Sequence, residues 1–375
     1  MDGRMLGPVQ VGMLGYGCMR FPLNRETRQI DEDKAGALLR RAMEAGVTYY
    51  DTAWPYHEGE SEAFLGRALA EYPRERYQLA TKLPCWKVSR PEQALDFFYR
   101  QLERLNTDYV DFYLLHSLGE QSWRKMRDLG IPELMENLKR EGKIRQFGFS
   151  FHDRYEVLEE ILTCRNWDFC QLQLNYMDTE TQAGLRGYHL AQRLGVPVVV
   201  MEPVKGGSLA LLPEDVSAPL KAVQPKASPA AWAMRWVGSL SNVRVILSGM
   251  TTMEQLDENL ETFTSFEPLE DGERAALEET AQCLRRRLRN GCTDCRYCMP
   301  CPAGVNIPQN FAVWNGMSMF QNRRLTRQRW RLLGEGKAEL CVGCGSCEET
   351  CPQHIPIRAH LKQVTEDVGA FVART

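Results

Sequence analysis

The stretch YVDFYLLHS at residues 109–117 has the composition of a buried β-strand that ends on a polar side chain. Aromatic and aliphatic residues dominate it up to Leu115, and His116 stands at its carboxyl end. The segment before it, PEQALDFFYRQLERL at residues 91–105, has the apolar spacing of an amphipathic helix. Strands that alternate with helices are typical of a parallel sheet.

This alternation continues from residue 11 to about residue 250. Further helical patterns cover residues 33–46 and 228–237, and the second opens with Ser228 as its N-cap and Pro229 in its first turn. Eight strands in about 250 residues predict a closed (β/α)8 or TIM barrel. A doubly wound open sheet is the alternative, but no GxGxxG motif follows an early strand. The predicted strands are residues 11–17, 47–53, 77–83, 109–117, 144–150, 169–175, 196–202 and 243–249.

Polar side chains stand at the carboxyl ends of six predicted strands, and a seventh, Gln171, lies further inside its strand. A single one of them could be a strand-end cap. In a TIM barrel, however, the carboxyl ends of all strands meet at one rim, where the active site is built. We therefore expect a site at this rim. Its six strand-end residues are Asp51, Lys82, His116, Ser150, Glu202 and Ser248.

From about residue 251 the sequence becomes helical, first at residues 252–263 and then at residues 273–290. We place a boundary near residues 281–290, which predicts a barrel domain at 1–280 and a small second domain at 281–375. The second domain contains two cysteine runs separated by 39 residues, and the latter part of that separation, residues 321–336, is predicted to be helical.

The two cysteine runs each contain four cysteines, and each fourth cysteine is followed by a proline. Such runs bind [4Fe-4S] clusters, and in two-cluster ferredoxins the fourth cysteine ligates the other cluster. We therefore expect Cys351 to join the first three cysteines of the first run and Cys301 to join those of the second. The first run has two residues before its fourth cysteine, where three are usual. The eight cysteines are Cys292, Cys295, Cys298, Cys301, Cys341, Cys344, Cys347 and Cys351.

A zinc site with four cysteine ligands is the alternative, because paired CxxC motifs also bind zinc. Zinc usually needs two such pairs per ion, whereas each run here has a third and a fourth cysteine. The long helical separation resembles α-helical ferredoxin modules more than the compact βαβ ferredoxin. Five scattered cysteines are expected to be small buried side chains: Cys18, Cys85, Cys164, Cys170 and Cys283.

The overall composition of the 375 residues argues against some classes of binding partner. A formal net charge of -3 gives no global electrostatic reason to expect nucleic acid or an acidic membrane. The first residues, MDGRMLGPVQ, do not resemble a secretory signal, and no apolar run is long enough to span a membrane. We expect a soluble cytoplasmic protein in which thirteen cysteines favour metal binding or catalysis over disulfides.

Four rim residues could form a proton-donating group for a carbonyl substrate. A tyrosine with a pKa of about 10 donates poorly at neutral pH unless a neighbouring ammonium group lowers that pKa. Asp51, Lys82 and His116 follow three consecutive strands, and Tyr56 lies on the loop after Asp51. Taken singly, each has an ordinary structural explanation, such as a helix cap, a packed tyrosine, a surface lysine or a core histidine.

Three segments resemble motifs of the aldo-keto reductase superfamily: DTAWPYHEGESE (51–62), LATKLP (79–84) and VDFYLLHS (110–117). The similarity extends over residues 11–265 and includes GYGCMR, GFSFHD, QLQLNYMD, VVVMEPVKGGSLA and LSGMTTMEQLDEN. It implies that Tyr56 is the general acid and base, Lys82 lowers its pKa, Asp51 orients Lys82, and His116 positions the carbonyl group. The motifs CMPCPAGVNIP and CVGCGSCEETCPQHIPI resemble those of members with an appended ferredoxin domain, so this subgroup covers the whole chain.

The same resemblance implies a nicotinamide site. Ser150 and Gln171 match positions that hold the nicotinamide amide, and Gly206 and Gly207 fall in the pyrophosphate loop. The positions implied to bind the cofactor are Gly17, Met19, Ser150, Gln171, Met201, Glu202, Gly206, Gly207, Ser248, Gly249, Gln255, Glu258 and Asn259.

Several cofactor positions depart from the pattern of the superfamily. Phe151 replaces an asparagine, and Met201 replaces the aromatic residue that stacks on the nicotinamide. Gly249, Met250 and Gln255 replace the Lys, Ser and Arg that grip the 2'-phosphate. Glutamine cannot replace the charge-assisted bonds of an arginine. We therefore expect NADH to be preferred over NADPH.

The leading hypothesis is an anaerobe-type oxidoreductase in which the barrel acts on a small carbonyl or alcohol and two [4Fe-4S] clusters carry electrons. A nicotinamide transfers a hydride, whereas each cluster transfers one electron, so coupling them needs a radical-tolerant substrate or a mediator such as flavin. No flavin motif is visible, but a flavin is not excluded. The alternatives are a plain NAD(P)H-dependent carbonyl reductase with structural clusters and a non-catalytic electron-transfer or scaffold subunit. A redox protein is a candidate partner.

Overall fold

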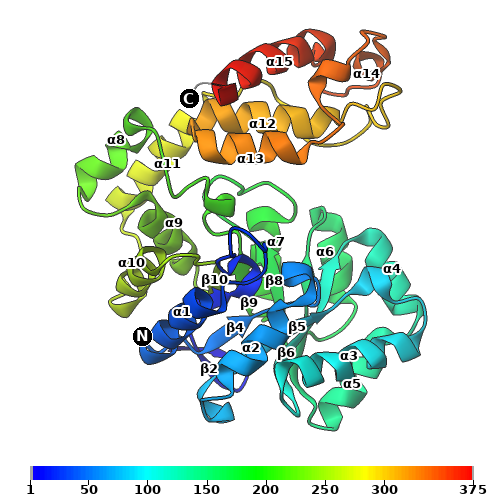
Figure 1. Ribbon diagram of the computed structural model, residues 1–375, viewed down its shortest axis with the longest axis vertical. Coiled ribbons are helices and arrows are strands. Elements are labelled where there is room, and N and C mark those ends of the chain that lie inside the picture. The colour runs from blue at the N-terminus through cyan, green and yellow to red at the C-terminus, as the bar shows by residue number, and fades with distance from the viewer. Residues whose placement is uncertain (1–2, 374–375) are drawn as a thin grey trace. The chain divides into compact units, whose positions relative to one another are not determined.

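The computed structural model describes residues 3–373, which form two compact units (Figure 1). One unit contains the chain up to Pro203 together with Ala233–Leu269. The other contains Val204–Trp232 and the chain from Glu270 onward. The domain boundary near residues 281–290 stays a prediction.

The first unit is a closed barrel of eight parallel strands in the order β10-β3-β4-β5-β6-β7-β8-β9, which confirms the predicted fold (Figure 1). The barrel closes where Ser248 of the last strand pairs with Tyr16 of the first. The strands are β3 Leu14–Gly17, β4 Tyr49–Asp51, β5 Gln78–Leu83, β6 Val110–Leu118, β7 Ile144–Phe151, β8 Phe169–Gln173, β9 Val198–Met201 and β10 Val243–Ser248.

Helices follow the strands, and their ends have recognisable signals. Asp31 caps the first helix by accepting a hydrogen bond from the backbone N–H of Lys34, and Ser228 Oγ accepts one from the N–H of Ala231, as predicted for an N-cap. Asn106 ends α3 in a left-handed conformation. The helices are α1 Glu32–Glu44, α2 Ser61–Leu69, α3 Pro91–Leu105, α4 Glu120–Asp128, α5 Ile131–Arg140, α6 Tyr155–Thr163, α7 Gly184–Arg193, α9 Pro229–Gly238 and α10 Met253–Thr264.

A short hairpin precedes the barrel, and the sequence did not predict it. Its strands are β1 Gly3–Leu6 and β2 Val9–Gly12, which pair antiparallel across a turn at Gly7. The predicted strand at 11–17 is therefore wrong as one element, because it breaks at Met13 into the end of β2 and the start of β3. Leu6 and Val11 of the hairpin are 1% exposed and belong to the apolar core inside the barrel.

Side chains fill the inside of the barrel, and later residues of the same strands form the rim. Successive side chains of a strand point to opposite faces, so residues two apart share a face. Tyr49, Ala80 and Leu114 belong to the apolar core of the barrel. Two residues further along the same strands stand Asp51, Lys82 and His116. The polar rim is therefore the next layer above the core.

The second unit is mainly helical, and no strand lies within its described tail, residues 291–373. Helices α12, α13 and α15 pack around a core that includes Phe311, Trp314, Trp330 and Leu361 (Figure 1). Trp314 Nε1 donates a hydrogen bond of 2.8 Å to Asp367 Oδ2, which ties α12 to α15. The helices are α8 Glu214–Val223, α11 Asp271–Arg285, α12 Ile307–Phe320, α13 Arg323–Leu332, α14 Ser346–Glu349 and α15 Ile357–Ala373.

Both cysteine runs lead into a helix in the same way. Helix α12 begins at Ile307, six positions after Cys301, and α15 begins at Ile357, six positions after Cys351. Asn310, which is fully buried, fixes the approach to the second run because it accepts a hydrogen bond from the N–H of Ala338 and donates to the carbonyl of Gly336. Among residues 3–373, no helix is both long enough and apolar enough to cross a membrane.

Candidate functional site

The barrel mouth contains a buried ion pair. Lys82 Nζ lies 2.6 Å from Asp51 Oδ1 and also donates to the backbone carbonyl of Thr52 at 2.8 Å. Both charged side chains are at most 4% exposed. Burial acts to lower the pKa of Lys82, but Asp51 and Tyr56 outweigh it, so the pKa lies above its ordinary value. Lys82 is therefore a fixed cation at neutral pH.

Tyr56 stands beside this cation. Lys82 Nζ lies 3.4 Å from the phenol oxygen and 5.0 Å from the centre of the phenol ring. Burial raises the pKa of Tyr56 above 10, and the charge of Lys82 opposes that rise. The phenol is therefore protonated at neutral pH and can donate a proton.

His116 forms the next part of the mouth. Its ring lies edge-on to Tyr56, with ring centres 6.1 Å apart, and 5.1 Å from the ring of Trp86, which is half exposed. Burial, Lys82 and His152 hold the pKa of His116 well below 6.5. The imidazole is therefore neutral, and its buried Nδ1 has no hydrogen-bond partner among residues 3–373.

The residues matched to the nicotinamide amide lie in the same layer. Gln171 Nε2 donates a hydrogen bond to Asp51 Oδ2 at 3.3 Å across the barrel. Its buried Oε1 has no partner within the described chain, so it can accept a hydrogen bond from an amide group. Ser150 Oγ accepts a hydrogen bond from the N–H of Ser117 at 2.7 Å. Phe151 is buried next to Phe149 and offers no polar atom.

The loop after β10 does not have the arrangement of side chains that would grip a 2'-phosphate. Met250 is 1% exposed, and Gln255 Oε1 accepts a hydrogen bond from the N–H of Thr251. A Cβ atom on Gly249 would lie 2.9 Å from Cδ of Arg20, so the arginine stem packs over this glycine. Arg20 is therefore a basic side chain next to the loop, and no sequence motif signals this contact.

Glu258 and Asn259, two of the implied cofactor positions on α10, differ in burial. Asn259 is buried and donates a hydrogen bond of 2.9 Å to Ser248 Oγ, which ties α10 to the end of β10. Glu258 is half-buried on the same helix. The Asn259 amide is thus already used within the protein, whereas the Glu258 carboxylate has solvent access.

The remaining cofactor positions lie at the ends of strands or on the turns that follow them. Glu202 comes directly after β9 and has a left-handed backbone with φ of 59°, and Asn175 Nδ2 donates to its carbonyl. Gly206 and Gly207 have φ values of 63° and 90°, which glycine adopts readily. Met19 is 58% exposed and follows Gly17 at the end of β3. Met201, the last residue of β9, is half-buried.

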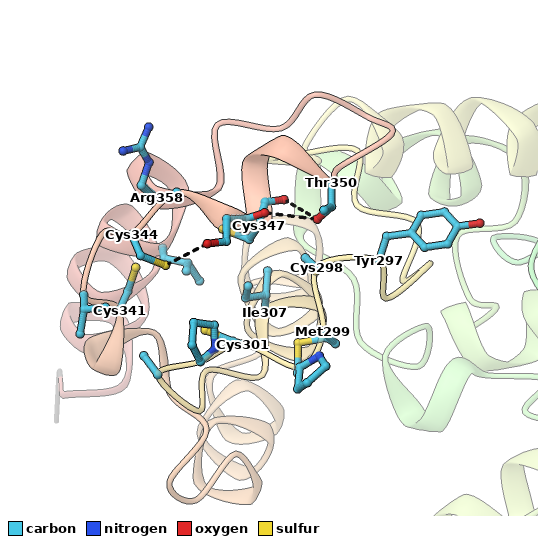
Figure 2. Close-up of a pocket in the computed structure, with 17 residues that line it drawn as sticks. Tyr297, Cys298, Met299, Cys301, Ile307, Cys341, Cys344, Cys347, Thr350 and Arg358 are labelled. Atoms are coloured by element: carbon cyan, nitrogen blue, oxygen red, sulfur yellow. Dashed lines mark hydrogen bonds between the residues drawn. The ribbon is translucent and has the colours of Figure 1, made fainter.

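The eight cysteines of the two runs line two cavities. One is lined by Cys301, Cys341, Cys344 and Cys347, and Figure 2 shows their side chains around it. The other is lined by Cys292, Cys295 and Cys351. Cys298 lies on the wall of both. Each cavity therefore combines cysteines from both runs.

The donor sets fit cubane clusters. Five cysteines line one cavity and four line the other, because Cys298 lines both, and a cubane binds one thiolate at each of its four iron atoms. Within residues 3–373, no three His, Cys, Asp or Glu side chains converge closely enough to hold a single metal ion. A cubane spreads its ligands over four metal atoms and needs no such convergence.

The five scattered cysteines are not all alike. Cys18, Cys85 and Cys170 are buried, as predicted. The prediction for Cys164 is wrong, because this residue is exposed directly after the last turn of α6. Cys283 is half-buried near the end of α11.

Sequence reasoning missed His57, which directly follows Tyr56. Its backbone is left-handed, with φ of 51°, and its Nε2 accepts a hydrogen bond from the N–H of Phe21 at 3.1 Å. The signal available in the sequence was its place beside the tyrosine, but a contact between positions 36 residues apart has no sequence signature.

The family comparisons divide the chain into the same two parts as its motifs do, a barrel segment and a segment with the two cysteine runs. Residues 13–282 match the Aldo/keto reductase family, and residues 291–355 match the 4Fe-4S dicluster domain. The holo form of an aldo-keto reductase from Bacillus halodurans has a TM-score of 0.64 at 28% identity, over 75% of this chain and 96% of that chain.

Two curated relatives come from Escherichia coli. A methylglyoxal reductase is 37% identical over 153 residues, which is 41% of this chain, and the match spans only 50% of that relative. An NADH-specific methylglyoxal reductase is 26% identical over 296 residues, which cover 66% of this chain and 87% of that protein.

The closed barrel, the polar rim above its core and the family match over residues 13–282 agree with one another. The cysteine-lined cavities lie within the segment that matches the iron-sulfur domain. The chain therefore belongs to the aldo/keto reductase family and is an oxidoreductase with a C-terminal 4Fe-4S ferredoxin domain.

Proposed function

We propose that the barrel interconverts a small carbonyl compound and its alcohol, with Tyr56 as general acid and base. The observation that carries the proposal is the position of Lys82 Nζ, 2.6 Å from Asp51 and 3.4 Å from the Tyr56 hydroxyl. A cation fixed beside a phenol stabilises the phenolate that forms when the proton leaves.

Each residue of the mouth has one task in this reaction. Asp51 holds the ammonium group of Lys82 in place. Tyr56 donates its proton to the carbonyl oxygen during reduction and takes it back during alcohol oxidation. His116, which is neutral, can donate an N–H hydrogen bond to the same oxygen and so orient the carbonyl group. Trp86 supplies an apolar wall next to His116.

A bound nicotinamide would supply or accept the hydride. Ser150 and Gln171 would hold its amide, and the free Oε1 of Gln171 supports this role. We propose that NADH is preferred over NADPH. The burial of Met250 supports the preference, and so does Gln255, whose Oε1 already accepts a hydrogen bond from the N–H of Thr251, because neither side chain carries the positive charge of a phosphate clamp. One of the two Escherichia coli relatives is an NADH-specific methylglyoxal reductase, which agrees with this preference.

We further propose two [4Fe-4S] clusters with crossed ligands. Cys351 would complete the site of Cys292, Cys295 and Cys298, and Cys301 would complete that of the second run. The cavity linings support the crossing because each fourth cysteine faces the three cysteines of the other run. One hydride carries two electrons, and two clusters can together accept two, one each. A mediator such as a flavin, or a redox protein, would connect these steps.

A second candidate function is a plain carbonyl reductase whose clusters only stabilise the tail. One observation favours it: six of the eight cysteines, Cys292, Cys298, Cys301, Cys341, Cys347 and Cys351, pack against the apolar core of the tail. Clusters bound there would contribute to folding whether or not they carry electrons.

Anaerobic mixing of the oxidised holoprotein with NADH tests the leading proposal. Loss of the visible cluster absorbance would show that electrons pass from the nicotinamide to the clusters. If the clusters stay oxidised while NADH is consumed with methylglyoxal, the second candidate is correct. Tyr56→Phe protein provides the control, because its clusters should load normally.

A further inference from the structure

Tyr56 lies on a loop with an uncommon backbone. The three residues after it, His57, Glu58 and Gly59, all have left-handed φ values, of 51°, 57° and 97°. Residues other than glycine rarely adopt this region, and they persist there only where surrounding contacts hold them. The loop that carries the catalytic candidate is therefore held in place by something other than its own backbone preference.

The side chain of His57 supplies such a contact. Its Nε2 accepts a hydrogen bond from the backbone N–H of Phe21 at 3.1 Å, and its ring packs 5.7 Å from the Phe21 ring. Phe21 is itself anchored, since it is 2% exposed and contacts the rings of Tyr16 and Phe64. The imidazole thus ties the Tyr56 loop to the core beneath the rim.

Phe21 directly follows the short turn Cys18–Arg20, and this turn is bound from a second side. Ser61 Oγ donates a hydrogen bond to the Cys18 carbonyl at 3.2 Å and lies 2.9 Å from the hydroxyl of Thr52. The Thr52 carbonyl in turn accepts a hydrogen bond from Lys82. Contacts therefore connect His57, through the turn Cys18–Arg20, with Lys82. Tyr56 lies between His57 and Lys82.

The protonation state of His57 suits the contact. Burial lowers its pKa below the ordinary value, although the Cys18 carbonyl and Glu60 oppose this shift. The ring is consequently neutral at neutral pH, and one ring nitrogen keeps the lone pair that the Phe21 N–H needs.

We propose that His57 is a positioning residue that sets the place of the Tyr56 hydroxyl next to Lys82. The inference rests on the proposed role of Tyr56. It adds that this role depends on an acceptor nitrogen on the residue that directly follows Tyr56. A displacement of about 1 Å at a reacting group can lower the rate about a hundredfold. Loss of the hydrogen bond between Phe21 and His57 should therefore cause a measurable fall in rate.

Two substitutions separate positioning from folding. His57→Gly removes the acceptor but suits the left-handed backbone, so thermal stability should change little. His57→Gln places an amide oxygen near the position of Nε2, and Gln182 and Gln321 show that glutamine adopts the same conformation elsewhere in this chain. Arg28→Gly is the matched control, since exposed Arg28 is another left-handed residue of the barrel unit, with φ of 64°.

The first readout needs no substrate. In holoprotein labelled with [ζ-13C]tyrosine, the resonance that is missing from Tyr56→Phe identifies Tyr56 among the thirteen tyrosines. This resonance should shift and broaden in His57→Gly and return to the wild-type position in His57→Gln. A Tyr56 resonance in His57→Gly that coincides with the wild type overturns the proposal.

The second readout is turnover of methylglyoxal with NADH. His57→Gly should lower kcat at least about tenfold while KM for NADH stays within about twofold, and His57→Gln should recover most of kcat. Equal losses in His57→Gly and Arg28→Gly would show a general loop effect and overturn the proposal. Full turnover by Tyr56→Phe would instead contradict the proposed function, and the resonance experiment would still decide whether His57 positions the tyrosine.

Discussion

Cys351 lines the same cavity as Cys292, although the two residues belong to different cysteine runs. The pairing arises because each run leads into its own helix, and the two helices, α12 and α15, pack against each other. The fourth cysteine of each run is thereby turned toward the first three of the other.

Single substitutions in the two runs should remove different clusters. We expect about eight iron atoms and eight sulfides per chain in anaerobically purified protein, because eight thiolates make two cubane sites. Cys351→Ser should disturb the cluster of the first run, and Cys344→Ser that of the second, each leaving about four iron atoms. Iron, sulfide and EPR analysis measure this. Cys164→Ser, at an exposed cysteine outside both cavities, should keep the full iron content, and a preparation that contains chiefly zinc would contradict the assignment.

Tyr56→Phe should lower turnover about a hundredfold or more, within the usual range for general acid catalysis. Lys82→Met should do similar damage, because the phenol loses the charge that opposes the rise in its pKa. The double variant should be little worse than either single one, since both act on one proton transfer. Steady-state rates measure this defect, and an unchanged cluster absorbance shows that the variant has not unfolded. A Tyr56→Phe enzyme with full activity would show that the reaction bypasses the phenol.

Nicotinamide titrations should show NADH bound at least as tightly as NADPH. The physical reason is the absence of a basic group at Gly249, Met250 and Gln255. Fluorescence titration of both cofactors measures the difference. If NADPH binds more than about tenfold tighter, equivalent to about 1.4 kcal/mol, the preference is wrong. Arg20→Gln then shows whether the side chain over Gly249 is the clamp, because only NADPH affinity should fall.

The pH dependence should follow Tyr56 and not His116. Burial raises the pKa of Tyr56, so carbonyl reduction, which needs the protonated phenol, should stay constant near neutral pH and decline only above about pH 10. Alcohol oxidation, which needs the phenolate, should rise over the same alkaline range. Lys82→Met should move both limbs to higher pH, because Lys82 acts to lower this pKa. Rate profiles in both directions check the signs, and a limb near pH 6.5 would mean that His116 titrates.

The barrel could be predicted from sequence because each strand carries its own local pattern of apolar residues and ends on a polar one. The common position of Asp51, Lys82 and His116 at the rim could be predicted for the same reason, since the strand register alone brings strand ends to one rim. The break at Met13 was missed because β2 and β3 are both apolar and nothing in their composition marks the point where one sheet ends and the other begins.

Contacts between distant parts of the chain could not be predicted. The hydrogen bond from Phe21 to His57 and the packing of Arg20 over Gly249 depend on loop conformations that the composition leaves open. The crossed cysteines were predicted from a spacing rule, and the cavities agree with the rule although the first run has a shorter final spacing. The crossed ligation itself stays a prediction.

The hairpin before the barrel has a consequence for where this protein can be shortened. The family match begins at residue 13, so a chain cut there would appear to keep every part of the reductase. It would nevertheless lose Leu6 and Val11, which belong to the apolar core inside the barrel. Burial of two such side chains contributes roughly 3–6 kcal/mol, an amount comparable to the whole stability of many domains. The ten residues of the hairpin therefore close the end of the barrel opposite the rim residues, and the apolar layer beneath those residues depends on the hairpin.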